Sequence, residues 1–332
     1  MKKVSFVVGL DYQNNRIFDL TNKFLNRDNC LYPYFLLKEE FKKHGYDLLT
    51  SDLCSPDQAH LVLYNEMPKP FPKLIDIEKS FLLLFETELI RADNWNLKKH
   101  KFFKKIFTWN NALVDNKLYY KFNFPNEIKS TPIGIAGRSG FLVSISGNKT
   151  SHHPLELYSQ RLKTIKWFED HHPEDLDFYG IGWEYKFNVR FQKIFRKLKI
   201  LNLLPKNSSR CYKGRVDEKI AVLRTYKFAL CFENAKDIDG YITEKIFDCF
   251  FAGTIPIYWG PSNINQIIPE NCYIERTKFN THEDLYHFLK KLTDEDILAY
   301  QKNIELFLKS EGVTPFSEHF FAKNIVEIMT HE

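Results

Sequence analysis

A cluster of charged and polar side chains follows a short apolar run in the second half of this 332-residue chain. The run, residues 228–232, has the length of a buried strand. The side chains that follow and could bind a ligand are those of Glu233, Asn234, Tyr241, Glu244 and Lys245. Lys245 falls in the first turn of an expected helix, where the helix dipole disfavours a cation. An anion held between this lysine and the unpaired backbone N–H groups would offset that penalty, and phosphate is the natural candidate.

The elements expected around this cluster position it at the edge of a sheet. Residues 227–261 read as a strand, a polar loop, an apolar helix over 246–251 that ends at Gly253, and a second strand over 254–259. This order is one crossover unit of a parallel sheet. Ligands of such sheets lie at the carboxyl ends of the strands, against helix N-termini. The pattern therefore predicts an anion site at this edge.

The rest of the chain alternates strand and helix patterns, which indicates an α/β protein of two domains. Strands are expected at 3–9, 46–50, 59–64, 79–85, 103–109, 141–145, 176–179 and 272–274, and helices at 34–44, 155–170, 217–223, 281–292, 294–308 and 316–329. A polar, proline-containing segment over 123–138 reads as a linker. We expect an N-terminal domain over 1–135, a C-terminal domain over 136–310, and a terminal helix over 311–332 that packs back on the N-terminal domain.

Composition excludes several classes of protein. The apolar fraction of 44% supports buried cores, and the net charge of +5 is mild. No basic run with interleaved aromatics suggests nucleic-acid binding, and no CxxC pair suggests zinc. No apolar stretch reaches the length of a membrane span, so we expect a cytoplasmic protein, with peripheral contact at the inner membrane face left open. Residues 186–203 are basic and amphipathic; a solvated helical face is favoured there over an acceptor or membrane contact.

The central stretch resembles the α-1,3/4-fucosyltransferase family. The family pattern FEN…GYxTEK…GxxPxxxG is matched by residues 232–234 and 240–245, with Gly253, Pro256 and Gly260 in register. Residues 177–183 are similar to a D-x-Y/F-G-R-G segment of the family, with Ile181 where arginine is usual. Residues 159–161 are similar to its S-x-R segment. The resemblance covers about residues 140–275.

The resemblance implies a GT-B architecture, in which two Rossmann-like domains face a central cleft. The C-terminal domain would bind GDP-fucose and the N-terminal domain the acceptor. By position in the motifs, the residues that would bind the donor are Arg161 and Lys245 at the diphosphate, Tyr241 at a phosphate, Glu244 at the ribose and Asn234 at the loop or nucleoside. Arg161 in a surface salt bridge, Tyr241 as a packing residue and Glu233 as a cap of its own loop are the structural alternatives.

Catalysis would need a base for the acceptor hydroxyl. Glu86 directly follows the apolar run 81–85, at a strand end comparable with that of the family's proposed base, and Glu88 is its rival. The implied function is inverting transfer of L-fucose from GDP-fucose to a GlcNAc-containing oligosaccharide, most simply as an α-1,3 linkage in lipopolysaccharide or surface-glycan synthesis. The alternatives are another GDP-linked deoxysugar as donor, or a non-catalytic GDP-sugar or glycan-binding protein. No metal is expected as a required cofactor, because Asp237 and Asp239 read as loop solvation; stimulation by divalent cations stays open.

Overall fold

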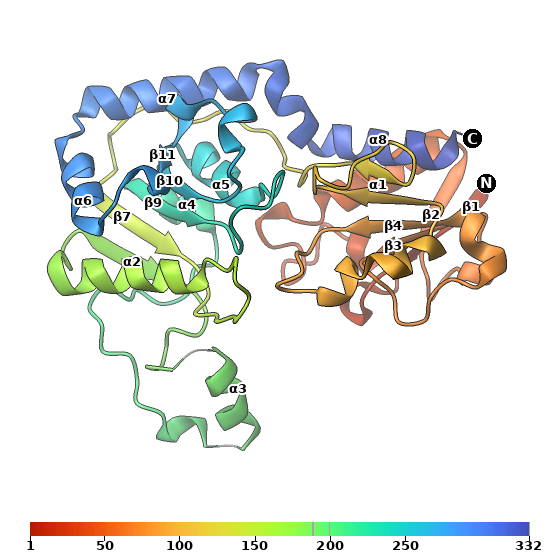
Figure 1. Ribbon diagram of the computed structural model, residues 1–332, viewed down its shortest axis with the longest axis horizontal. Coiled ribbons are helices and arrows are strands. Elements are labelled where there is room, and N and C mark those ends of the chain that lie inside the picture. Colours follow the sequence, from red (N-terminus) through yellow and green to blue (C-terminus); the bar gives the residue numbers. More distant parts are fainter. Residues whose placement is uncertain (188, 199, 332) are drawn as a thin grey trace. The chain divides into compact units, whose positions relative to one another are not determined.

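Two parallel β-sheets organise the protein in a computed structural model that describes residues 1–187, 189–198 and 200–331 (Figure 1). The chain divides into two compact units. The first comprises Met1–Ile128, the tripeptide Asp239–Tyr241 and the chain from Val313 on. The second comprises Lys129–Ile238 and Ile242–Gly312. The sequence-based division did not separate the tripeptide from its surroundings.

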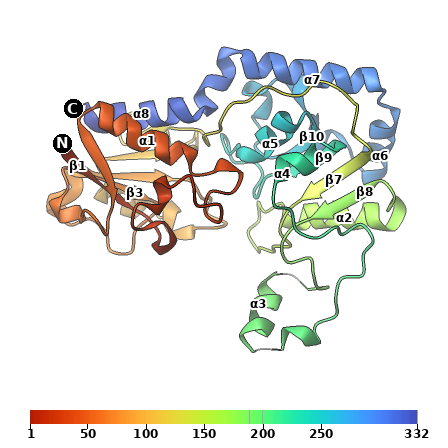
Figure 2. The ribbon, with the colours of Figure 1, turned by 180° about the vertical axis from the view of Figure 1, so that it is seen from behind.

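The first unit is built on a six-stranded sheet of order β2-β1-β3-β4-β5-β6, in which all neighbours are parallel. Its strands are β1 (Lys2–Val7), β2 (Tyr46–Thr50), β3 (Leu61–Asn65), β4 (Ser80–Leu84), β5 (Lys105–Thr108) and β6 (Tyr119–Lys121). Helices α1 (Tyr32–Lys43) and α8 (Glu318–Thr330) lie side by side (Figures 1 and 2). Phe321 of α8 packs on Tyr34 and Phe85, so the end of the chain completes the core of this unit.

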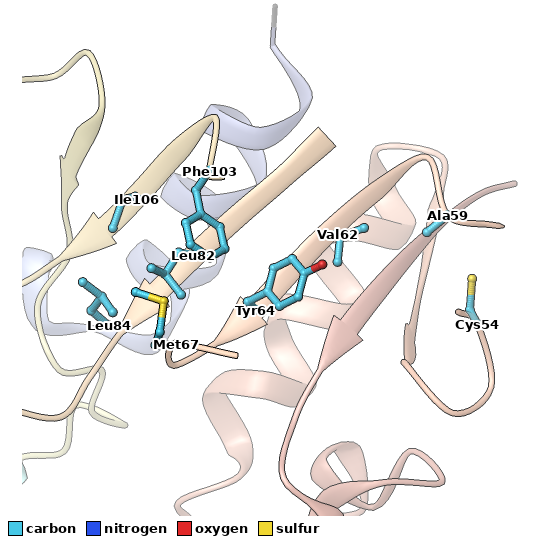
Figure 3. Close-up of a cluster of buried hydrophobic side chains, with 9 residues drawn as sticks. All are labelled: Cys54, Ala59, Val62, Tyr64, Met67, Leu82, Leu84, Phe103 and Ile106. Atoms are coloured by element: carbon cyan, nitrogen blue, oxygen red, sulfur yellow. The ribbon is translucent and has the colours of Figure 1, made fainter. Parts of the chain in front are cut away.

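Apolar side chains cover the sheet of the first unit on both faces. Val62, Leu82 and Ile106 project into one buried cluster together with Phe103 and Met67 (Figure 3). The intervening residues of the same strands, such as Leu63 and Leu83, are also fully buried. This explains why these strands read as continuous apolar runs rather than alternating ones. All five residues of β4 are buried, which fixes the point where polar residues begin after it.

The second unit is built on a five-stranded parallel sheet of order β11-β10-β9-β7-β8. Its strands are β7 (Gly140–Ile145), β8 (Leu176–Tyr179), β9 (Tyr226–Phe232), β10 (Ile255–Trp259) and β11 (Ile274–Glu275). Its helices are α2 (Tyr158–His171), α3 (Val189–Lys197), α4 (Lys219–Leu223), α5 (Glu244–Ala252), α6 (His282–Lys291) and α7 (Asp294–Lys309). Among the described residues, no helix is both long and apolar enough to cross a bilayer.

The predicted crossover unit is confirmed. β9 and β10 pair in parallel from Phe228–Ile255 to Phe232–Trp259, and α5 connects them. Gly253 ends α5 in a left-handed conformation, with φ of 66°. A side chain there would also meet the carbonyl oxygen of Pro132. One expected strand was displaced: Cys272 lies in a short 3-10 turn and β11 begins only at Ile274.

Candidate functional site

Glu233 is the hub of the loop that follows β9. Its side chain is completely buried, and its carboxylate accepts four hydrogen bonds. The donors are the Thr243 N–H (2.9 Å), the Thr243 hydroxyl (2.8 Å), the Lys245 ammonium (3.0 Å) and the Tyr258 hydroxyl (3.2 Å). Several donors of this kind stabilise a buried carboxylate. Glu233 therefore fastens the start of α5 and strand β10 to the carboxyl end of β9.

Lys245 completes this arrangement at the N-terminus of α5. Thr243 caps the helix by accepting from the Lys245 N–H, and its hydroxyl lies 2.8 Å from the Lys245 Nζ. The ammonium forms an ion pair with Glu233 at 3.0 Å and stays 26% exposed. A lysine in the first turn of a helix calls for an anion to offset the helix dipole, and the protein itself supplies one in Glu233. The position of Lys245 therefore does not by itself demand a phosphate, although the ammonium remains accessible to one.

Glu244 begins α5 and is half-exposed. Desolvation raises its pKa, but the ammonium groups of Lys245 and Lys219 outweigh this and bring the pKa to about 2. A carboxylate is also favoured in the first turn of a helix. Glu244 is therefore ionised at neutral pH and can accept hydrogen bonds from hydroxyl groups. Its contact with a ribose stays a prediction.

Arg161 lies on α2 and is only 6% exposed. Its Nη2 donates to the carbonyl oxygens of Phe232 (2.5 Å) and Glu233 (3.2 Å), and its guanidinium lies over the Tyr158 ring. The surface salt bridge considered as an alternative is wrong, because the side chain is buried at the end of β9. The structure thus brings Arg161 and Lys245 to the same residue, Glu233: one to its carbonyl oxygen and the other to its carboxylate.

Asn234 joins this loop to the segment before α2. Its carbonyl oxygen accepts from the Leu157 N–H at 3.0 Å, and Ala235 pairs antiparallel with Glu156. This pairing engages Glu156 in an isolated β-bridge, and α2 starts at Tyr158 and not at 155 as expected. Asn234 itself is half-buried. The loop-shaping alternative for Asn234 agrees with these contacts, and a nucleoside contact stays a prediction.

Tyr241 belongs to the first unit, unlike the other predicted donor-binding residues. Its side chain is 2% exposed, and its ring centroid lies 4.7 Å from that of Trp109 and 5.8 Å from that of Phe124. Gly240, at φ of 86°, lies so close to the Trp109 carbonyl oxygen that a Cβ would be 2.3 Å from it. The packing alternative describes the ring of Tyr241 in this structure. A contact of its hydroxyl with a phosphate stays a prediction.

Glu86 lies in the first unit, one residue beyond Phe85 at the end of β4. It is half-buried, whereas Glu88 is exposed. Its main chain is held on both sides: the N–H donates to Glu66 Oε1 at 2.9 Å, and the carbonyl oxygen accepts from Trp95 Nε1 at 3.0 Å. The residue predicted as the base therefore has a fixed backbone.

Glu66 was missed by the sequence analysis. Its Oε1 also accepts from the Phe85 N–H at 3.1 Å, and the Asn94 amide donates to its other oxygen. Burial raises the pKa of Glu66 to about 7, against the opposing effect of these hydrogen bonds. Its position in the sequence could have indicated it. Glu66 directly follows strand β3, just as Glu233 directly follows β9, and Glu86 lies two residues beyond the end of β4.

Two cations, the N-terminus of α5 and an ionised Glu244 thus lie at the carboxyl ends of parallel strands, which suits a nucleoside diphosphate. The fold is that of the GT-B glycosyltransferases. An α1,3-fucosyltransferase solved with GDP-fucose matches with a TM-score of 0.54 and 17% identity, covering 100% of this chain and 91% of that one. Anabaena HepE, solved with UDP and glucose, matches with a TM-score of 0.58 and 10% identity, covering 100% of each chain.

Within this fold, part of the sequence is similar to one family. Residues 159–305 match the model of the C-terminal domain of glycosyltransferase family 10 (fucosyltransferase). An α-(1,3)-fucosyltransferase of Helicobacter pylori is 38% identical over 77 residues, 23% of this chain and 16% of that protein. An α-(1,4)-fucosyltransferase of Arabidopsis thaliana is 36% identical over 77 residues, 23% of this chain and 19% of that protein. The aligned segments span less than a fifth of the length of these relatives.

Proposed function

We propose that the protein is an inverting fucosyltransferase that transfers L-fucose from GDP-fucose to a GlcNAc-containing glycan, forming an α-1,3 linkage in lipopolysaccharide or surface-glycan synthesis. The observation that carries this proposal is the meeting of Arg161 and Lys245 at Glu233, inside the segment that matches the family-10 domain. The names of the matched relatives support fucose as the sugar.

In the proposed mechanism, the second unit binds the donor and stabilises its departing diphosphate. Lys245 and the N-terminal N–H groups of α5 face negative charge as it develops on the leaving group. Arg161 stabilises the carboxyl end of β9, because its guanidinium donates hydrogen bonds to the carbonyl oxygens of Phe232 and Glu233. Glu244, ionised at neutral pH, accepts hydrogen bonds from ribose hydroxyls.

The first unit supplies the base. Glu86 takes the proton of the attacking acceptor hydroxyl, and its fixed main chain reduces the reorganisation needed for that transfer. The hydroxyl displaces the diphosphate directly, so the configuration of the anomeric carbon is inverted and no covalent sugar–protein intermediate forms.

Thermal shift measurements with GDP, GDP-fucose and UDP test the donor. We expect stabilisation by both GDP compounds, since a ligand that binds only the folded state stabilises it by mass action. A protein that responds to none of them would end the transferase proposal, and a preference for UDP would change the donor. A response to GDP with transfer of a different GDP-deoxysugar would change only the sugar.

Mass-spectrometric product analysis with type 1 and type 2 N-acetyllactosamine acceptors tests the reaction. We expect Glu86→Gln to keep the GDP thermal shift and lose turnover, whereas Lys245→Ala loses both. Glu88→Gln is the matched control and should keep turnover. Loss of turnover in Glu88→Gln alone would move the base to Glu88. Donor binding without any transfer would favour the non-catalytic alternative.

A further inference from the structure

An arm formed by residues 186–187, 189–198 and 200–205 projects from the second unit. Figures 1 and 2 both show its helix, α3, standing apart from the sheet. Hydrogen bonds close its base: the Lys186 N–H donates to the Pro205 carbonyl oxygen and the Asn207 N–H to that of Glu184, both at 3.0 Å. The Glu184 carboxylate is paired with Arg215 at 2.7 Å. The arm is therefore attached through a defined neck.

One face of the arm is apolar and exposed. Its large apolar side chains with exposures between 40% and 70% are those of Phe187, Phe191, Ile194, Leu198 and Leu203. Phe191, Ile194 and Leu198 recur at helical spacing on α3 and directly after it, which places these three along one stripe. The ring of Phe187, before the helix, stacks on that of Phe191 with centroids 5.7 Å apart. Contiguous exposed apolar surface of this kind marks an interaction site, whereas single exposed apolar residues do not. A purely solvated helical face, favoured from the sequence, does not account for this stripe.

The charged residues of the arm are all basic. Residues 186–205 contain six lysines and arginines and no aspartate or glutamate. The formal net charge of the whole chain is +5, so the chain outside the arm has a formal net charge of −1. Lys193 and Lys197, one turn apart on α3, are exposed, and their helical spacing places them off the line of the apolar stripe. The positive charge of the protein is thus concentrated where its apolar stripe is exposed.

We propose that the arm binds an anionic lipid surface, with the stripe inserted at the boundary between headgroups and acyl chains and the cations among the headgroups. A basic helix with an exposed apolar face is the form that interfacial membrane helices take. A continuous anionic surface can pair with cations all around the arm, and no acidic residue of the segment opposes it. A second copy of the arm is a poor partner, because two strongly positive segments would repel each other. The proposal uses no residue of the donor or base sites and does not depend on the proposed reaction.

Vesicle flotation of the full-length protein tests this inference, with phosphatidylcholine vesicles that contain or lack phosphatidylglycerol. We expect binding only to the anionic vesicles, and release at high salt. Lys193→Glu with Lys197→Glu should weaken binding by about 25-fold or more, at about five-fold for each lysine removed. Phe191→Ser with Leu198→Ser should weaken it by about ten-fold or more through lost apolar burial. Both pairs should keep the wild-type melting temperature, since these side chains are exposed.

The matched controls lie on α7 of the same unit, where Lys302 is exposed and Leu306 is 67% exposed. Lys302→Glu and Leu306→Ser should bind vesicles as the wild type does. Absence of wild-type binding to anionic vesicles would overturn the proposal, as would equal binding to neutral vesicles or equal binding by the charge-reversed pair. A dimer in light scattering that becomes a monomer in the Phe191→Ser, Leu198→Ser pair, without vesicle binding, would assign the stripe to a second copy instead.

Discussion

Replacing Glu233 by Gln should destabilise the ligand-free protein and increase its stabilisation by GDP. The amide oxygen can still accept from the Thr243 N–H and the Tyr258 hydroxyl, but Lys245 loses its carboxylate. Removing one partner of a buried ion pair costs about 3–5 kcal/mol. Water reaches the Lys245 side chain, which is 26% exposed, so we expect a cost at or just below the lower limit of this range, about 2–3 kcal/mol. For a unit of this size that corresponds to a melting temperature lower by roughly 5–10 °C.

GDP should recover part of this loss. In the wild type, a diphosphate at Lys245 shares the ammonium with the Glu233 carboxylate and is repelled by it. In the Gln variant the diphosphate replaces the missing negative charge. One charge-assisted hydrogen bond contributes about 1.5 kcal/mol or more. At saturating GDP, the difference in unfolding free energy between the variant and the wild type should therefore become smaller by about that amount.

Differential scanning fluorimetry with and without GDP measures both effects. Glu270→Gln is the matched control, because Glu270 pairs with Lys278 at 2.8 Å but both side chains are about half-exposed. Such exposed pairs contribute under about 1 kcal/mol. If Glu233→Gln melts no lower than Glu270→Gln, the ion pair of the buried Glu233 carboxylate with Lys245 does not stabilise the protein. If GDP widens the difference, Glu233 positions Lys245 for the ligand rather than competing with it.

Three further predictions follow from single residues. Burial raises the pKa of Glu66 to about 7 from 4.5 in the unfolded chain. The stability that protonated Glu66 contributes is therefore fully present below pH 4.5, and about 3 kcal/mol of it is lost as the pH rises through 7. In urea titrations from pH 4 to 8, Glu66→Gln should show a smaller loss of unfolding free energy than the wild type. Gly240→Ala should lower the melting temperature sharply, because the added Cβ would clash with the Trp109 carbonyl oxygen. Gly214→Ala is the control: Gly214 has φ of 98° but open space around it, so its melting temperature should fall only through backbone strain. Equal decreases in the two variants would contradict the clash at Trp109. Tyr241→Phe keeps the ring that packs on Trp109, and we expect it to weaken the thermal shift by GDP; an unchanged GDP shift would leave Tyr241 as a packing residue only.

The sheet was predictable from the sequence because its strands are buried on both faces. Runs such as Phe228–Phe232 and Phe81–Leu84 have no polar residue to interrupt them, and in a parallel sheet that is the expected pattern. The crossover β9–α5–β10 followed from Gly253, whose left-handed conformation ends α5 as expected. The edge of the sheet was less predictable: β11 has only two residues, too few to carry a pattern.

The contacts within the candidate site were not predictable in the same way. The donors to Glu233 come from Thr243, Lys245 and Tyr258, which are 10, 12 and 25 residues away in sequence. No local periodicity links such positions, and only the fold brings them together. The burial of Arg161 is a similar case, because its acceptors are main-chain oxygens of β9, 71 and 72 residues away. Resemblance to a family indicated which residues matter, but not how they contact each other.

Three glutamates near the ends of parallel strands show why position alone does not define a role. Glu66 and Glu233 hold other parts of the protein through their carboxylates: the first the main chain of Phe85 and Glu86, the second the start of α5. Glu86 is held by its main chain. A carboxylate that already accepts several hydrogen bonds from its own chain has fewer lone pairs left for a substrate hydroxyl. The hydrogen bonds that Glu66 and Glu233 accept therefore assign these two residues to support of the fold, although both follow strands as Glu86 does.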